Sequence, residues 1–423
     1  MKQLLILLGG GVIIFCIWAN QFWNSINTPP QVDIPMPALP HPNGYDYFRR
    51  AGAAYVKDID GVDEITNGWD GISDNTYRNH KKYPLAAKKA WLKQNAKAFQ
   101  LLREGLKYPA LHPRTRSFSD VGPAEIEYRA LGRALAVESH VRAAGGNWNG
   151  AVQSLLDDYQ FGNQIARGGP LNIGLVSGDI ETRSLYELSH LIPHTNAPTA
   201  KMAAAGMEKV YEQRYPFYKM LEEEKWLILD SKLQLMESPS WRTRLVQDFK
   251  LPLSDYPKIY TLSKRQLISD LTQSMNAAID NAQRPYTQQR PIPATDDPLV
   301  ALLLPGCKFL RWSCARQNVF AVEFMTMYAL RAYKMDTGHY PENLKALVPT
   351  YLHKIPIDPF DGINPLHYQL QGKKYLLWSI GPDGVDNHAT PIFNNLDEDA
   401  VSAQYQLLDP KSKGDVVAGI SQM

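Results

Sequence analysis

Apolar residues recur at helical spacing through most of this chain, which favours a mostly α-helical protein. Between Gly44 and about Arg284, side chains three and four positions apart form apolar stripes, the pattern of helices that bury one face. For example, Leu92, Phe99 and Leu102 share one face of a predicted helix. The pattern predicts helices over residues 45–56, 85–106, 123–144, 148–167, 171–192, 198–213, 216–236 and 257–282. Residues 44–284 are therefore expected to form one α-helical domain.

Two of these helices form a pair that is joined by a turn of small residues. The helices over 123–144 and 148–167 flank Gly145-Gly146-Asn147, and Ala151 suits a close helix–helix contact. This pair resembles a degenerate tetratricopeptide unit, which implies a solenoid-like stack of helices. The sequence has no clean 34-residue period.

The pattern changes near the end of the chain, where helical spacing gives way to strand signals. A helix is predicted over 315–335 and ends at Asp336-Thr337-Gly338, since glycine suits a helix C-cap. Pro341 then begins a short helix. Two strands are predicted, Leu366–Gln371 and Lys374–Ile380, around a turn at Gly372. The C-terminal part is therefore expected to be a small α+β domain with an antiparallel sheet.

The order of residues in this region resembles the globular domain of the G-type (major) pseudopilins of type II secretion systems. The matching positions are Tyr333, Asp336, Gly338, Tyr340, Pro341, Leu344, Leu347, Tyr351, Leu352, Pro356, Asp358, Pro359, Gly362, Tyr368, Gly372, Tyr375, Ser379, Gly381, Asp383 and Gly384. The resemblance covers about a seventh of the chain. It implies a pseudopilin-like module and a connection with a type II secretion or pilus-like envelope system.

The resemblance also implies a structural calcium ion in the loop after the second strand. Calcium takes six to eight oxygen ligands. The oxygen donors of this loop are Asp383, Asp386 and Asn387, and Asp397 and Asp399 could complete the site. The alternative is a solvated acidic turn, because the sequence after Gly384 departs from the glycine-rich loop of the family.

The N-terminus differs from that of a pseudopilin. Leu4–Ala19 is an apolar run behind a single Lys2, and it lacks the Phe-Thr-Leu-x-Glu opening of the family. We interpret residues 1–23 as a signal anchor that holds the chain in the membrane through residues 4–19, with the bulk on the extracytoplasmic, periplasmic side. Cleavage after Ala19 is the alternative. A filament subunit is not expected.

Proline-rich stretches divide the rest of the chain. Residues 24–43 contain six prolines and are interpreted as a stalk, which could reach roughly 60 Å as polyproline II. Pro285, Pro291 and Pro293 mark a linker over 285–297 between the helical domain and a C-terminal domain over 298–423.

The net charge and the cysteines indicate which partners and bonds to expect. The 423 residues carry a net charge of +2, so the overall charge implies no nucleic-acid partner. Cys307 and Cys314 could form a disulfide in an oxidising envelope. Within one helix their seven-residue spacing, about 10 Å, is too long for the bond. Pairing therefore requires Pro305-Gly306 to keep Cys307 outside the helix.

No catalytic motif is present in the sequence: it contains no Gly-x-Ser-x-Gly, no P-loop and no His-Glu-x-x-His. We expect a non-enzymatic structural or binding protein with a partner in the cell envelope. The alternative is an extracytoplasmic enzyme that acts on cell wall or glycan, with paired carboxylates from Glu125, Glu127 and Glu138 in the helical domain.

The basic segment Arg78–Lys107 could bind acidic lipids or wall polymers, or be a solvated helix face.

Overall fold

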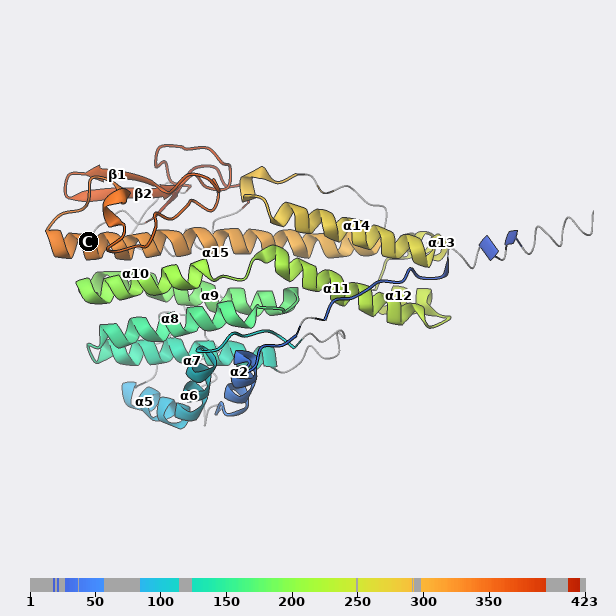
Figure 1. The fold of residues 1–423 in the computed structure, drawn as a ribbon, viewed down its shortest axis with the longest axis horizontal. Helices are drawn as coiled ribbons and strands as arrows, with labels where there is room; N and C mark the ends of the chain where they lie inside the picture. The colour runs from blue at the N-terminus through green and yellow to red at the C-terminus, as the bar shows by residue number, and fades with distance from the viewer. Residues whose placement is uncertain are drawn as a thin grey trace, which may run out of the picture.

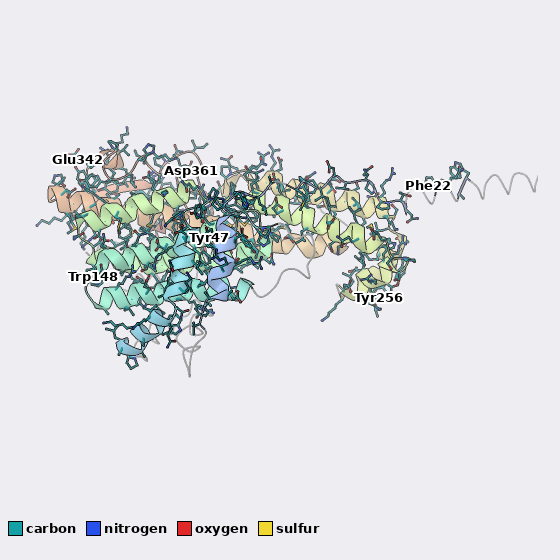
Figure 2. All side chains as sticks on the ribbon, turned by 60° about the horizontal axis from the view of Figure 1, so that its bottom comes forward. Phe22, Tyr47, Trp148, Tyr256, Glu342 and Asp361 are labelled. Atoms are coloured by element: carbon teal, nitrogen blue, oxygen red, sulfur yellow. The ribbon has the colours of Figure 1, made fainter. Side chains whose placement is uncertain are left out.

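The computed structural model describes residues 18–19, 21–22, 27–36, 38–56, 84–113, 124–248, 250–290, 292, 298–392 and 410–418. The described chain is mostly helical with a small antiparallel sheet, which confirms the predicted fold class at this level. Figure 1 shows an elongated stack of helices with the sheet lying over one end of the long helix α15. Figure 2 shows Tyr256 near one end of this body and Trp148 and Glu342 near the other.

The helices follow the predicted ranges closely in most of the chain. Their bounds are α2 Gly44–Ala53, α5 Leu85–Gln94, α6 Ala96–Gly105, α7 Ala124–Ala144, α8 Trp148–Ile165, α9 Leu171–Leu191, α10 Ala197–Glu212, α11 Phe217–Met236, α12 Trp241–Asp248, α13 Tyr256–Thr261, α14 Lys264–Ala282 and α15 Pro298–Thr337. Short 3-10 helices lie at η3 Ile192–His194, η4 Leu253–Asp255, η5 Tyr286–Gln288 and η6 Leu344–Leu347.

Two predicted helices are each split in the structure, and side-chain hydrogen bonds explain the breaks. Asn95 separates α5 from α6, and its buried Oδ1 accepts from the backbone N–H of Val56 at 2.9 Å. Ser263 separates α13 from α14, because its hydroxyl caps the Gln266 N–H at 3.1 Å. Neither hydrogen bond is visible in the spacing of apolar residues along the sequence, so the spacing alone predicts one continuous helix at each place.

The 40-residue helix α15 is the common spine of the molecule. It contains the helix predicted over 315–335 but begins at Pro298, well before that range. Its C-terminal half packs against α9 and α10, and its N-terminal part lies beside α14 (Figure 1). Val300 and Cys307 are buried in the hydrophobic cluster of α11–α14, which explains why the helix continues through Pro305 despite the cost of an interior proline.

The sheet is built around the predicted hairpin. Strands β1 His367–Gln371 and β2 Lys374–Ser379 pair antiparallel, with Tyr368 opposite Leu377. The turn uses Gly372 at a φ of +61°, a conformation that favours glycine. A third strand, β3 Val416–Val417, pairs antiparallel with the end of β2. The sequence predicted the hairpin but not β3.

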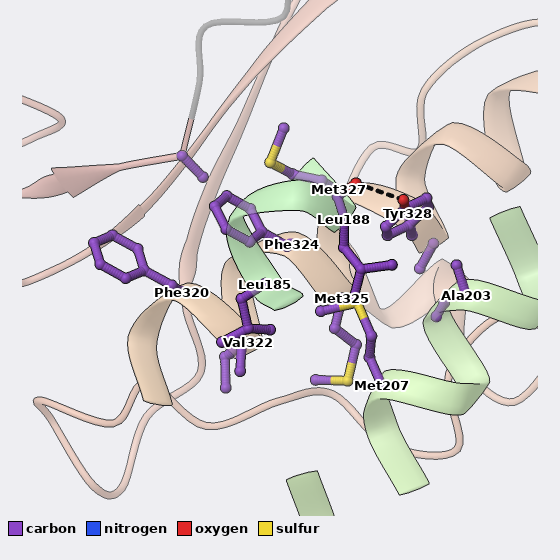
Figure 3. Packing of buried hydrophobic residues seen from close by; sticks show 14 of the residues in the cluster. Leu185, Leu188, Ala203, Met207, Phe320, Val322, Phe324, Met325, Met327 and Tyr328 are labelled. Carbon is purple, nitrogen blue, oxygen red and sulfur yellow. Dashed lines mark hydrogen bonds between the residues drawn. The ribbon is translucent and has the colours of Figure 1, made fainter. Parts of the chain in front are cut away.

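One hydrophobic core joins the two predicted domains. Tyr375 and Leu377 of the sheet belong to the same buried cluster as Tyr328 of α15 and Leu188 of α9. Figure 3 shows Tyr328 and Leu188 within this cluster. Residues from both ranges, 44–284 and 298–423, therefore belong to one buried cluster. The reason is that α15 buries one face under the sheet and another against the helices.

The proline-rich segments pack onto this body. Tyr286 of the predicted linker lies 5.4 Å from Trp312 and 5.6 Å from Phe360 between ring centroids, and Thr287 donates to the Phe360 carbonyl at 2.8 Å. In the predicted stalk, Val32 packs against the α11–α14 cluster and Asn43 caps α2. The described parts of both segments therefore lie along the helices, because their apolar side chains are covered there.

The predicted membrane segment, residues 4–19, lies outside the described residues except for Trp18 and Ala19. Within the part of the chain that the structure describes, no helix has both the length and the apolar character needed to span a membrane.

Candidate functional site

The loop after β2 contains three of the five predicted calcium ligands. Gly381 and Gly384, with φ of +69° and +70°, turn the chain sharply around Asp383. The two carboxylate oxygens of Asp383 accept from the N–H groups of Val385 at 3.1 Å and Gly414 at 3.2 Å. Asp383 therefore ties its own turn to the segment before β3.

Asp386 lies further along the same loop and contacts both strands of the hairpin. Its carboxylate accepts from the Trp378 indole at 3.0 Å and from the His388 N–H at 2.9 Å. The imidazoles of His367 and His388 lie 3.5 and 3.6 Å from its other oxygen. Burial alone would raise the pKa of Asp386, but these donors and imidazoles outweigh burial and hold the pKa below its usual value.

Asp415, beside β3, completes this loop, and sequence reasoning missed it. Its two oxygens accept from the N–H groups of Asn387 at 3.1 Å and Ala389 at 2.7 Å. His388 and Ala389 have φ of +55° and +60°, a strained region for residues with a side chain. Burial raises the pKa of Asp415, although the two backbone N–H groups oppose that shift. Asp415 and Asp386 together hold the strained turn.

The structure therefore brings Asp383, Asp386 and Asn387 into one loop, where both carboxylates accept hydrogen bonds from N–H groups. The Asn387 amide donates to the Val385 carbonyl at 2.8 Å. Asp397 and Asp399 lie outside the described residues. Among the described residues, this arrangement caps and braces a turn, as the alternative of an acidic turn expects.

A buried carboxylate lies beneath the sheet, where two residues of the pseudopilin-like pattern meet. Asp358 accepts from the Ser379 hydroxyl at 2.7 Å and from the N–H groups of Phe360 and Ile380, both at 2.9 Å. Burial raises the pKa of Asp358 and these donors oppose the shift. Asp358 fixes the crossing segment against the end of β2.

Of the carboxylates proposed for glycan chemistry, Glu138 lies in a network of ion pairs. Glu138 accepts from Arg103, Arg142 at 2.9 Å and the Ser154 hydroxyl at 2.7 Å. Arg103 continues to Asp157 at 2.7 Å, so the group forms a network of ion pairs between α6, α7 and α8. The side chain of Glu125 lies outside the described residues, and Glu127 lies against Gly52. The network joins the three helices, and both oxygens of Glu138 take part in it.

The basic segment divides between the surface and the interior. Residues 78–83 lie outside the described residues. Lys88 is buried, which lowers the pKa of its ammonium, and Arg103 points into the ion-pair network. Lys89, Lys93 and other members are exposed on α5 and α6. The described exposed lysines fit the solvated helix face better than a dedicated binding surface.

The disulfide between Cys307 and Cys314 is not formed in the structure. Both thiols are free, because α15 continues unbroken through Pro305 and Gly306 and so separates the cysteines by two helical turns. Burial raises the pKa of each thiol to about 12, which leaves both in the unreactive protonated form. The condition on which the prediction depended, a helix that starts after Cys307, is not met.

A second group of possible metal ligands lies where α10 meets the C-terminal module. Glu208 and Glu212 of α10 and His353 of the segment after η6 each offer one ligand atom, and the three atoms lie within 4.8 Å of one another. The nearest sequence signal is the pair of glutamates one helical turn apart, which gives no indication of His353.

Comparison of the chain with protein-family models, curated proteins and solved structures finds no match.

Proposed function

We propose that this protein is a membrane-anchored extracytoplasmic protein of structural or binding type that works beside a type II secretion or pilus-like system of the envelope. In this proposal residues 1–23 anchor the chain as a single-pass segment. The helical region is a solenoid-like scaffold, and the pseudopilin-like module on α15 is the recognition head.

The observation that supports this proposal most is that residues of the pseudopilin-like pattern contact one another. Tyr351 donates its hydroxyl to Asp336 at 2.9 Å, and the rings of Tyr340 and Tyr375 meet edge to face at 4.7 Å. The bond between Ser379 and Asp358 adds a further pair. Matches that are scattered through the sequence thus form one packed unit, as expected if the pattern specifies that module.

The module also presents a surface suited to a protein partner. Ile363 is 70% exposed and Val385 is 55% exposed. The neighbouring glycines, Gly362 and Gly384, lie against Pro285 and Thr287 respectively, so the two loops sit over one turn of the chain. In this proposal the two exposed apolar side chains, on adjacent loops, belong to the surface that contacts the partner.

Affinity purification of the tagged full chain from detergent-solubilised membranes of the native cell tests the partner. We expect co-purification of a component of a secretion or pilus-like machine. Ile363→Asp combined with Val385→Asp should abolish it. Leu253→Asp is the matched control, because Leu253 is 78% exposed on η4, which lies outside the module. Recovery of no such component would refute the association with this class of machine.

The anchor is tested separately. The full chain should remain with the membrane pellet after carbonate extraction, and a variant without residues 1–23 should be released. Protease added to intact spheroplasts should digest the chain if the bulk lies outside the cytoplasm. Release of the full chain by carbonate would contradict the anchor.

A further inference from the structure

The contact between α10 and the segment after η6 is built around one oriented carboxylate. Glu208 is only 6% exposed, and both of its oxygens accept from the backbone N–H of His353 at 2.9 Å. The N–H of Lys354 adds a third bond to Oε1 at 3.1 Å. A carboxylate offers about four acceptor positions, so Oε2 still has a lone pair available.

Two exposed side chains stand beside this carboxylate. Glu212 follows Glu208 by one helical turn, so the two lie on the same face of α10. His353 brings an imidazole to the same place, and one ligand atom of each residue lies within 4.8 Å of the others. Two carboxylate oxygens and one imidazole nitrogen form a donor set that suits zinc.

The spacing needs only a small adjustment to hold an ion. Zinc binds oxygen and nitrogen at about 2.0–2.2 Å, so two ligand atoms on one zinc ion are separated by roughly 3–4 Å. Glu212 and His353 are exposed and can rotate, whereas Glu208 is fixed by the backbone. The mobile ligands can therefore close on the fixed one.

A cation already faces this group. The Lys354 ammonium lies 2.9 Å from Glu212 Oε1, and its side chain is 66% exposed. An ion pair at the surface contributes little free energy, and the flexible lysine can move into solvent. Lys354 therefore acts as a competitor that a divalent ion must displace.

We propose that Glu208, Glu212 and His353 bind one zinc ion that fastens the C-terminal module to α10. Three protein ligands leave a fourth position for water. Calcium and magnesium fit less well, because they prefer oxygen ligands and an imidazole is one of the three donors here. This site is independent of the proposed secretion partner.

Isothermal titration of the chelator-stripped full chain in detergent tests the site, with zinc, calcium and magnesium chlorides as probes. We expect one zinc ion per chain and at least tenfold weaker binding in His353→Ala and Glu212→Gln. His339→Ala, which changes another exposed imidazole of the module, should bind zinc like the wild type. Each variant is first checked for an unchanged circular dichroism spectrum; both glutamate and histidine targets are exposed.

Lys354→Met separates a zinc site from an ion-pair clamp. If the site binds zinc, removing the competing ammonium should tighten zinc binding several-fold. If the cluster is only a clamp, neither the wild type nor Lys354→Met binds zinc with one-to-one saturation, and the proposal is wrong. Zinc binding that is equally strong in His353→Ala and Glu212→Gln would also overturn it.

Discussion

The hydroxyl of Tyr328 on α15 donates a hydrogen bond to the backbone carbonyl of Leu188 on α9 at 2.6 Å, and both residues are fully buried (Figure 3). The bond joins residues 140 positions apart in the sequence. It ties the spine of the C-terminal module to a helix of the scaffold. The two regions should therefore unfold together.

Tyr328→Phe should lower the free energy of unfolding by about 1 kcal/mol, because it removes one buried hydrogen bond and keeps the ring. Tyr328→Ala should cost about 3–5 kcal/mol, since it also leaves a cavity. Urea unfolding of the full chain in detergent measures both. Tyr260→Phe is the control, because Tyr260 is 49% exposed and its hydroxyl contacts Thr243 at the surface, where water can replace the lost bond. Equal midpoints for Tyr328→Phe and Tyr260→Phe would contradict a structural role for the bond.

Asp358→Asn should destabilise the module by about 1–3 kcal/mol, because an amide NH2 replaces one acceptor and faces a buried donor. Ser379→Ala should cost about 1 kcal/mol and leave the two backbone bonds of Asp358 in place. A double-mutant cycle in urea unfolding should show coupling between the two changes, since the residues contact each other. Additive effects would indicate that the hydrogen bond contributes nothing.

Asp358 and Ser379 could both be identified from the sequence, because the patterns that contain them span only a few residues. Asp358 and Ser379 fall within short patterns that the sequence displays directly, as do the hairpin turn at Gly372 and most helix limits. Helical period and turn residues act over a few positions, so they are readable from the chain alone.

Features that depend on distant contacts were not readable. Asp415 lies 28 residues beyond Asn387, and Glu208 lies 145 residues before His353. The continuation of α15 through Pro305 also depends on distant contacts. Burial of Val300 and Cys307 against α11–α14 outweighs the tendency of Pro305 to end the helix. The break at Asn95 depends on a hydrogen bond to Val56, 39 residues away.

Stability should fall as the pH rises from about 4 to about 6, partly because of Asp158. This fully buried carboxyl lies 3.1 Å from Arg183, yet burial outweighs that charge and raises its pKa to about 6. The usual unfolded value is about 4, so the folded state holds the proton more tightly in this window. The stabilisation is complete below pH 4 and is lost as the pH passes 6.

Asp158→Asn should make stability fall less steeply with pH, as measured by urea unfolding midpoints from pH 4 to pH 8. The variant also removes a partner of Arg183, so its stability should be lower overall. Glu181→Gln should reduce the slope between pH 4.5 and 7, because burial raises the pKa of Glu181 to about 7. The exposed Glu342→Gln is the control and should keep the wild-type slope. If stability falls with pH as steeply in both test variants as in the wild type, these two carboxyl groups are not the cause of the pH dependence.

Calcium should leave the melting temperature of the chelator-stripped chain unchanged within about one degree. The described carboxylates of the loop after β2, Asp383 and Asp386, brace the turn and supply fewer oxygens than the six to eight that calcium takes. Asp415→Ala should cost about 1–3 kcal/mol with or without calcium, since it strands the N–H groups of Asn387 and Ala389. Calcium is added to stripped protein so that zinc does not contribute. A calcium-dependent rise in melting temperature that Asp383→Asn removes would instead establish the calcium site, with Asp415 as an additional brace.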